Sequence, residues 1–310
     1  MRVLALRPAD ADEAAEASEL LLTGGTLRPA SSGRRPARTR ASLGSSAFKW
    51  LLRLFGICYV GLLVGVPVGS VVWRALSPGL ASAVDAVTSS AGLHALWLTL
   101  EVTALAVACN TVFGLGVALI LARRRFPGAS VLEALIDLPL SLSPVVVGLA
   151  LLLFWSSTQG WARLVVVRLG FEVLFSFPGI VLASAFISLP YVVREVLPVL
   201  VEIGTEQEQA AHTLGAGSFY TFGRITLPSI RWGLAYGVVL TAARVLGEFG
   251  AVSVVSGDVV GRTQTLTLYV NSLFQNYDYP GAYAGALLLA LISLCLLGLL
   301  SLSRRRRAVT

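Results

Sequence analysis

The chain has 310 residues, of which 55% are hydrophobic and only 13% are charged. Its mean hydropathy of +0.78 excludes an ordinary soluble globular domain and indicates a membrane protein. The net charge of +7 does not indicate nucleic-acid binding, because the basic residues flank apolar segments instead of forming a patch interleaved with aromatic residues. Anionic lipid headgroups are their expected partners.

Three regions differ in composition along the chain. Residues 1–48 are rich in Ala, Arg, Ser, Gly and Pro without apolar periodicity, which predicts a disordered cytoplasmic extension. Residues 49–303 hold the long apolar segments and are predicted to form a transmembrane domain. Residues 304–310 are predicted to be a basic cytoplasmic tail.

Apolar segments long enough to cross a bilayer, which takes roughly 20 residues, occur six times. Two prolines, Pro139 and Pro144, are expected to break the third segment. We predict an all-α polytopic membrane protein with six transmembrane helices. The segments are Leu54–Trp73, Val102–Ala122, Leu138–Trp155, Val173–Val193, Leu234–Ser256 and Pro280–Ser303.

The orientation follows from the 24 Lys and Arg residues, which are retained on the cytoplasmic side of short loops. Most of them are cytoplasmic if the amino terminus lies inside. Both termini, the basic turn Arg123–Arg125 and the loop at about 203–230 are therefore predicted to be cytoplasmic.

Catalytic, cofactor and metal sites are not expected in this chain. Lys49 is the only lysine, so the phosphate loop G-x-x-x-x-G-K-[ST] is absent from the sequence. An intramembrane protease would need a buried base, whereas His94 is predicted near an outer interface and His212 in a loop. The cysteines have no metal-ligand spacing and are expected to act as small hydrophobes; they are Cys58, Cys109 and Cys295.

The polar loop at about 203–230 contains the stretch QAAHTLGAGSFYTFGRITLP, residues 209–228. Glu206 and Glu208 place negative charge in the first turn of a helix, where the helix dipole favours it. Gly215 supplies the left-handed conformation that ends a helix. A helix of two to three turns with an Ala-Ala face is predicted, either docking closely on a partner protein or lying as a plain connector on the membrane surface.

A charged pair interrupts the fifth apolar segment in the stretch RVLGEFGA, residues 244–251. Arg244 and Glu248 are spaced to pair along one helix face, while Ala243, Gly247 and Ala251 form a ridge of small residues for tight packing. Two interpretations stay open: a structural ion pair, or a pair that lines or gates the path of an anion together with Gly247 and Phe249.

The polar loop resembles the EAA loop of bacterial ABC importer permeases. The residues that carry this resemblance are Glu208, Gln209, Ala210, Ala211, Gly215, Ile225, Leu227 and Pro228. The stretches 227–257, 137–148 and 262–268 are similar to the W-type permease subunit of sulfate/thiosulfate importers. The family's loop begins with glutamate, where this chain has Gln209 and can offer only a neutral hydrogen bond.

This resemblance covers about residues 50–303 and implies a non-hydrolysing permease subunit in the inner membrane. It implies three protein partners: a second, homologous permease, an ATPase dimer that binds the ATP, and an extracytoplasmic sulfate-binding protein. Transport would proceed by alternating access, driven through the loop. Molybdate or tungstate as the cargo, and a passive anion channel as a different class, remain the alternatives.

Overall fold

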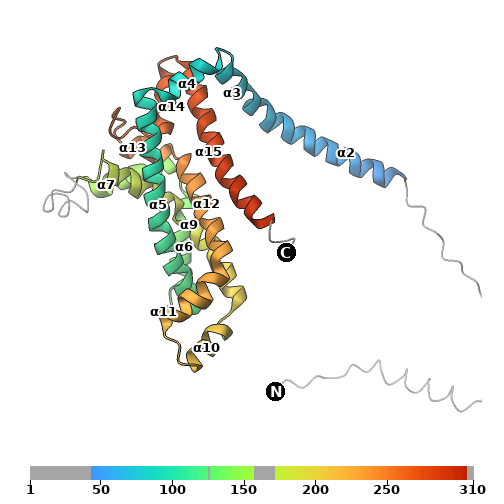
Figure 1. Ribbon diagram of the computed structural model, residues 1–310, viewed down its shortest axis with the longest axis vertical. Coiled ribbons are helices and arrows are strands. Elements are labelled where there is room, and N and C mark those ends of the chain that lie inside the picture. Colours follow the sequence, from blue (N-terminus) through green and yellow to red (C-terminus); the bar gives the residue numbers. More distant parts are fainter. Residues whose placement is uncertain (1–42, 125, 157–171, 306–310) are drawn as a thin grey trace, which may run out of the picture. The chain divides into compact units, whose positions relative to one another are not determined.

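The computed structural model describes residues 43–124, 126–156 and 172–305 (Figure 1). The chain divides into two compact units, Met1–Tyr59 and Val60–Thr310. In the first unit, helix α2 (Leu43–Val60) begins a few residues before the predicted boundary at residue 48. The predicted extension up to residue 42 and the predicted tail from residue 306 lie outside the described residues.

The described part of the second unit is helical throughout. Its longest helices are α5, α9, α12 and α15, and short helices connect them. In chain order the elements are the π-helix η1 (Gly61–Gly65), α3 (Val66–Leu76), α4 (Leu80–Thr88), α5 (Ser90–Arg123), α6 (Ala129–Ser141), α7 (Pro144–Trp155), α9 (Phe177–Ile203), α10 (Glu206–Thr213), α11 (Ser218–Thr221), the π-helix η2 (Phe222–Thr226), α12 (Leu227–Leu246), α13 (Gly250–Val255), α14 (Leu266–Gln275) and α15 (Tyr279–Arg305).

Helix α9 lies at the centre of this unit and packs against both α5 and α12. Over its most apolar stretch 56% of its residues are buried, against 22% for α5 and for α15. Asn110 of α5 reaches α9 and donates hydrogen bonds to the Ala185 carbonyl (2.9 Å) and to Ser188 Oγ (2.8 Å). In Figure 1, α10 and α11 lie at one end of this bundle, and α4 and α14 lie at the other.

Two glycines allow the three central helices to approach closely. Val192 of α9 is fully buried between Gly114 of α5 and Gly237 of α12. A Cβ atom added at Gly114 would lie 2.9 Å from Val192 Cβ, and one added at Gly237 would lie 2.9 Å from Val192 Cα. Small residues serve the same purpose at helix contacts in membranes, where close packing replaces the hydrophobic effect.

Four helices among the described residues are long and apolar enough to cross a membrane: Phe48–Leu76, Ser90–Arg123, Phe177–Ile203 and Tyr279–Gly298. Helices α6 and α7 are long and apolar enough to cross a membrane only if they are counted as one broken span. They are bent by 113° at the break between them. Pro144 begins α7 directly after this break, as the sequence predicted, whereas Pro139 stays inside α6. By length and composition the described residues therefore hold four spans, or five if the bent pair is one span, which does not confirm the predicted six.

The predicted fifth span, Leu234–Ser256, is not one helix. Helix α12 ends at Leu246, three residues follow, and α13 begins at Gly250. Helix α12 also carries Arg231 and Arg244, which lower its apolar character, and it is absent from the four candidate spans. The predicted ridge of small residues is interrupted for the same reason, since Gly247 is exposed while Ala251 is fully buried.

Large apolar side chains are exposed along several helices of the second unit. Examples are Val112 at 76% and Phe113 at 64% on α5, and Leu153 at 69% on α7. Surfaces of this kind are incompatible with water and are ordinary for faces that meet lipid or another membrane subunit.

We predict that Gly237→Ala destabilises the helix bundle, because the new methyl group would press on the α9 backbone at Val192. Overpacking of this kind costs about 1–3 kcal/mol. Thermal unfolding of the purified protein in detergent measures the effect. Gly116→Ala on α5 is the matched control, since nothing lies within 4 Å of its added Cβ. Equal unfolding temperatures for the two variants would contradict the close approach.

Candidate functional site

The loop at 203–230 folds as a helix-loop-helix element at one end of the bundle. Gly204, at φ +70°, separates the end of α9 from α10. Helix α10 carries Glu206 and Glu208 in its first turn, as the sequence predicted. It ends at the predicted glycine: Gly215 has φ +83°, and the Ala216 amide donates to the Ala211 carbonyl at 3.0 Å. This is the hydrogen-bond pattern of a helix closed by a left-handed residue.

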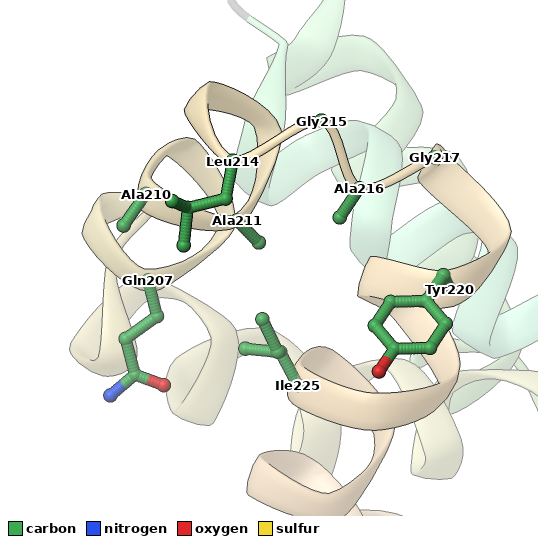
Figure 2. Close-up of a pocket in the computed structure, with 9 residues that line it drawn as sticks. All are labelled: Gln207, Ala210, Ala211, Leu214, Gly215, Ala216, Gly217, Tyr220 and Ile225. Carbon is green, nitrogen blue, oxygen red and sulfur yellow. The ribbon is translucent and has the colours of Figure 1, made fainter.

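An open apolar hollow of about 820 Å³ lies between α10 and the α11–η2 segment. Figure 2 shows Ala211, Ala216, Ile225 and Tyr220 pointing toward this common space. Leu214 at its edge is 89% exposed and Tyr220 is 62% exposed, so the hollow has an apolar lining that water reaches. The lining residues are Gln207, Ala210, Ala211, Leu214, Gly215, Ala216, Gly217, Tyr220 and Ile225.

The eight residues singled out in this loop do not form one surface. Four of them line the hollow: Ala210, Ala211, Gly215 and Ile225. Leu227 and Pro228 begin α12 instead, with the proline in its first turn. Gln209 is exposed, and its side chain donates to Thr205 Oγ1 at 2.9 Å.

Glu208 makes the charged contact that Gln209 cannot offer. Its Oε1 atom accepts hydrogen bonds from Arg123 Nη2 (3.0 Å) and from Thr226 Oγ1 (2.7 Å). Arg123 also donates from Nη1 to the Leu200 carbonyl at 3.0 Å. The two charged side chains are only 17% and 20% exposed. The sequence predicts Arg123 in a cytoplasmic turn without naming a partner for it, and it gives no indication of a role for Thr226.

The second predicted site, around Arg244, forms the expected ion pair, with Arg244 Nη1 2.6 Å from Glu248 Oε2. The pair does not lie along one continuous helix, because Glu248 follows the end of α12. The Glu248 side chain is 2% exposed and that of Arg244 is 28% exposed. A carboxylate this deeply buried requires a partner for its charge.

Glu248 has a second role that the sequence did not predict. Its Oε1 atom accepts a hydrogen bond from the Ala251 amide at 2.9 Å, which satisfies a free donor in the first turn of α13. Its backbone carbonyl accepts from Thr267 Oγ1 at 2.8 Å. Glu248 therefore stabilises the break between α12 and α13 in three ways. It neutralises Arg244, it accepts a hydrogen bond from the first turn of α13, and it binds Thr267 of α14.

The two remaining residues of this predicted site lie beside the ion pair. Phe249 is 41% exposed and lines an open cavity of about 310 Å³. Thr267 and Tyr283 line the same cavity, so it adjoins the break between α12 and α13. Gly247 is exposed at the end of α12. Within the described part of the chain, no three His, Cys, Asp or Glu side chains come together in an arrangement that could hold a metal ion.

Residues 110–309 match the family described as binding-protein-dependent transport system inner membrane component. A sulfate transport system permease protein CysW from Synechococcus elongatus is 47% identical, over 82% of this chain and 90% of that protein. The CysW protein of Escherichia coli K12 is 41% identical, over 83% and 88%. A CysT sulfate permease protein of Salmonella typhimurium is 38% identical, over 78% and 87%.

The fold is also found among solved structures. A bacterial ABC transporter involved in the import of alginate has a chain with a TM-score of 0.70 at 18% sequence identity. The likeness covers 85% of this chain and 98% of that one. The apolar helices and the family match define a multi-pass membrane protein of the importer permease class. The chain belongs to the family of binding-protein-dependent transport system inner membrane components.

We predict that Glu248→Gln destabilises the protein more than the double variant Arg244→Leu with Glu248→Gln. The single change leaves the Arg244 charge without its partner, and removal of one member of a buried pair costs up to ~3–5 kcal/mol. The glutamine keeps an oxygen for the Ala251 amide, so both variants retain the cap of α13. Thermal unfolding in detergent compares them.

A second double variant, Arg244→Leu with Glu248→Leu, is the control for the cap. It removes the charges and also the acceptor for Ala251, and loss of a cap costs about 0.5–2 kcal/mol. It should therefore be less stable than the double variant that keeps glutamine. Additive damage from the single changes, without recovery in either double variant, would show that the two side chains do not interact.

Proposed function

We propose that this chain is the membrane-spanning permease subunit of an ATP-driven importer that carries sulfate or thiosulfate inward. The observation that carries the proposal is its 47% identity to a sulfate permease protein along 90% of that protein's length. Relatives at 41% and 38% identity bear the same sulfate transport description. These descriptions favour sulfate over molybdate, the alternative cargo.

The proposed assembly contains further subunits. The relatives carry two names, CysW and CysT, which favours a pair of different but homologous permeases. A solved alginate transporter of the same fold is described in complex with a periplasmic protein, which supports an extracytoplasmic binding protein here. This chain lacks a phosphate loop, so ATP would be bound by an ATPase dimer and this subunit would be non-catalytic.

Helix α10 and its hollow would be the docking site for the ATPase. The support is physical: small residues line a concave, water-exposed apolar surface, and such surfaces are typical of sites covered by a partner. Phe219 beside it is 94% exposed. ATP binding to the partner would move α10, and the bundle would alternate between outward-open and inward-open states.

The proposed topology keeps six crossings with both termini in the cytoplasm. The bent pair α6–α7 would be the third crossing, and α12 with α13 the fifth. The end of the bundle that holds α10 also carries three basic residues, Arg123, Arg224 and Arg231. This excess of positive charge suits the cytoplasmic side. Arg244 and Glu248, with Phe249 at the neighbouring cavity, would line or gate the anion path.

The function is tested by sulfate uptake into vesicles that contain this chain, its partner permease and the ATPase, with the binding protein outside. We expect uptake that needs both ATP inside and the binding protein outside. A tenfold excess of unlabelled sulfate should compete, and the same excess of molybdate should not. Uptake without ATP would indicate a passive channel, and competition by molybdate alone would reassign the cargo.

We predict that a cysteine at Ala210, which lines the hollow, crosslinks to the ATPase and that the yield changes with nucleotide. A cysteine at Thr213 is the matched control, because this exposed residue of α10 does not line the hollow. Cys58, Cys109 and Cys295 are first replaced by serine. Equal crosslinking from both positions would contradict docking through the hollow, and crosslinking from neither would favour a connector on the membrane surface.

A further inference from the structure

A charged cluster beside the hollow, on a neighbouring face of α10, joins the ends of several helices at one end of the bundle. Glu208 belongs to α10, and its partner Arg123 is the last residue of α5. Arg123 also binds the Leu200 carbonyl in the last turn of α9. Thr226, the second donor to Glu208, lies directly before α12.

The charges suit the helix ends on which they lie. The carboxyl end of a helix carries partial negative charge, and Arg123 lies at that end of α5 while it binds that end of α9. The amino end carries partial positive charge, and Glu208 lies in the first turn of α10. The ion pair therefore connects two helix carboxyl ends to one helix amino end, with each charge in its favourable position.

The cluster is also tightly packed. The cavity beside it, lined among others by Arg123, Glu208 and Ile230, leaves only about 10 Å³ open to the centre of a water molecule. This volume barely holds one water molecule, which needs about 10–15 Å³. Direct contact between the side chains, not a layer of water, therefore connects α10 to the ends of α5 and α9.

The remaining contacts of α10 involve its neighbours in the chain. Its backbone packs chiefly against α11 and η2. The 3.0 Å contact to Arg123 reaches across 85 residues of sequence to α5. A displacement of α10 would thus be delivered to α5 and α9 through this ion pair.

We infer that Arg123 and Glu208 are positioning residues that transmit motion of the docking helix to the transmembrane helices. The inference rests on the proposed docking role of α10. The hollow would hold the ATPase, and the ion pair on a neighbouring face of the same helix would make its movement act on the bundle. Loss of the pair should then separate ATP hydrolysis from transport without releasing the ATPase.

The test compares Glu208→Gln with Glu206→Gln in vesicles that contain the full complex. Both changes remove one negative charge from the first turn of α10, but Glu206 is exposed whereas Glu208 faces Arg123. We expect sulfate transported per ATP hydrolysed to fall about tenfold in Glu208→Gln, within the usual range of coupling between sites. Glu206→Gln should keep the unmutated ratio, and the amount of co-purified ATPase should be the same in both.

Arg123 supplies the second arm of the test. Arg123→Lys keeps a positive charge near Glu208 and the Leu200 carbonyl, and Arg123→Gln does not. We expect the lysine variant to retain more transport per ATP than the glutamine variant. A purely structural role would lower assembly and thermal stability while leaving this ratio unchanged in the complexes that form.

The outcomes separate this inference from the proposed function. An unmutated complex without ATP-dependent uptake, or without bound ATPase, would overturn the proposed function itself. A normal ratio in Glu208→Gln, with uptake and ATPase binding intact in the unmutated complex, would overturn only the role of the ion pair. Failure of both Glu208→Gln and Arg123→Lys to assemble would also overturn it, because the pair would then be a requirement for folding.

Discussion

The need to pair every charge and every freed backbone group inside a low-dielectric bundle governs this structure. Helices in membranes can be interrupted only where protein or water satisfies the released donors and acceptors. At the break after α12, Glu248 supplies both an acceptor for the Ala251 amide and a counter-ion for Arg244. At the end of α9, Arg123 satisfies the Leu200 carbonyl. The buried charges therefore lie at the helix breaks and helix ends, where they also bind backbone groups.

Helix α9 is held both by close packing and by charged contacts. Its middle is closely packed, with Val192 enclosed by glycines of α5 and α12 and with Asn110 of α5 hydrogen-bonded to Ala185 and Ser188. Its carboxyl end is held by charge, through Arg123 and the ion pair with Glu208. A close-packed helix transmits displacement as a rigid body, because interiors at this density deform little. On the proposed coupling, motion applied to the charged end would therefore reach the packed middle of the bundle.

Local chemistry explains what the sequence could predict. The acidic first turn of α10 and the left-handed Gly215 depend on neighbouring residues, and both are confirmed. The Arg244–Glu248 pair was predicted from a separation of four residues and is also confirmed. Contacts between distant segments were missed: Arg123 and Glu208 lie 85 residues apart, and spacing along one chain does not pair them. The sequence did not predict the break at Gly247, because a hydropathy profile shows only an apolar run there. Such a profile does not indicate that Glu248 can cap a second helix.

Helix α10 departs in one respect from the usual surface helix, which turns its charges outward, because it buries a carboxylate. Here Glu208 points inward to Arg123, while Ala210 and Leu214 are exposed at the hollow. The inward carboxylate is stable only because Arg123 and Thr226 both donate to it. The polar contacts thus hold α10 with Ala210 and Leu214 exposed at the hollow, an apolar surface of the kind that a partner protein covers. The same contacts connect the helix to α5, so the proposed docking surface and its link to the bundle are neighbouring faces of one helix.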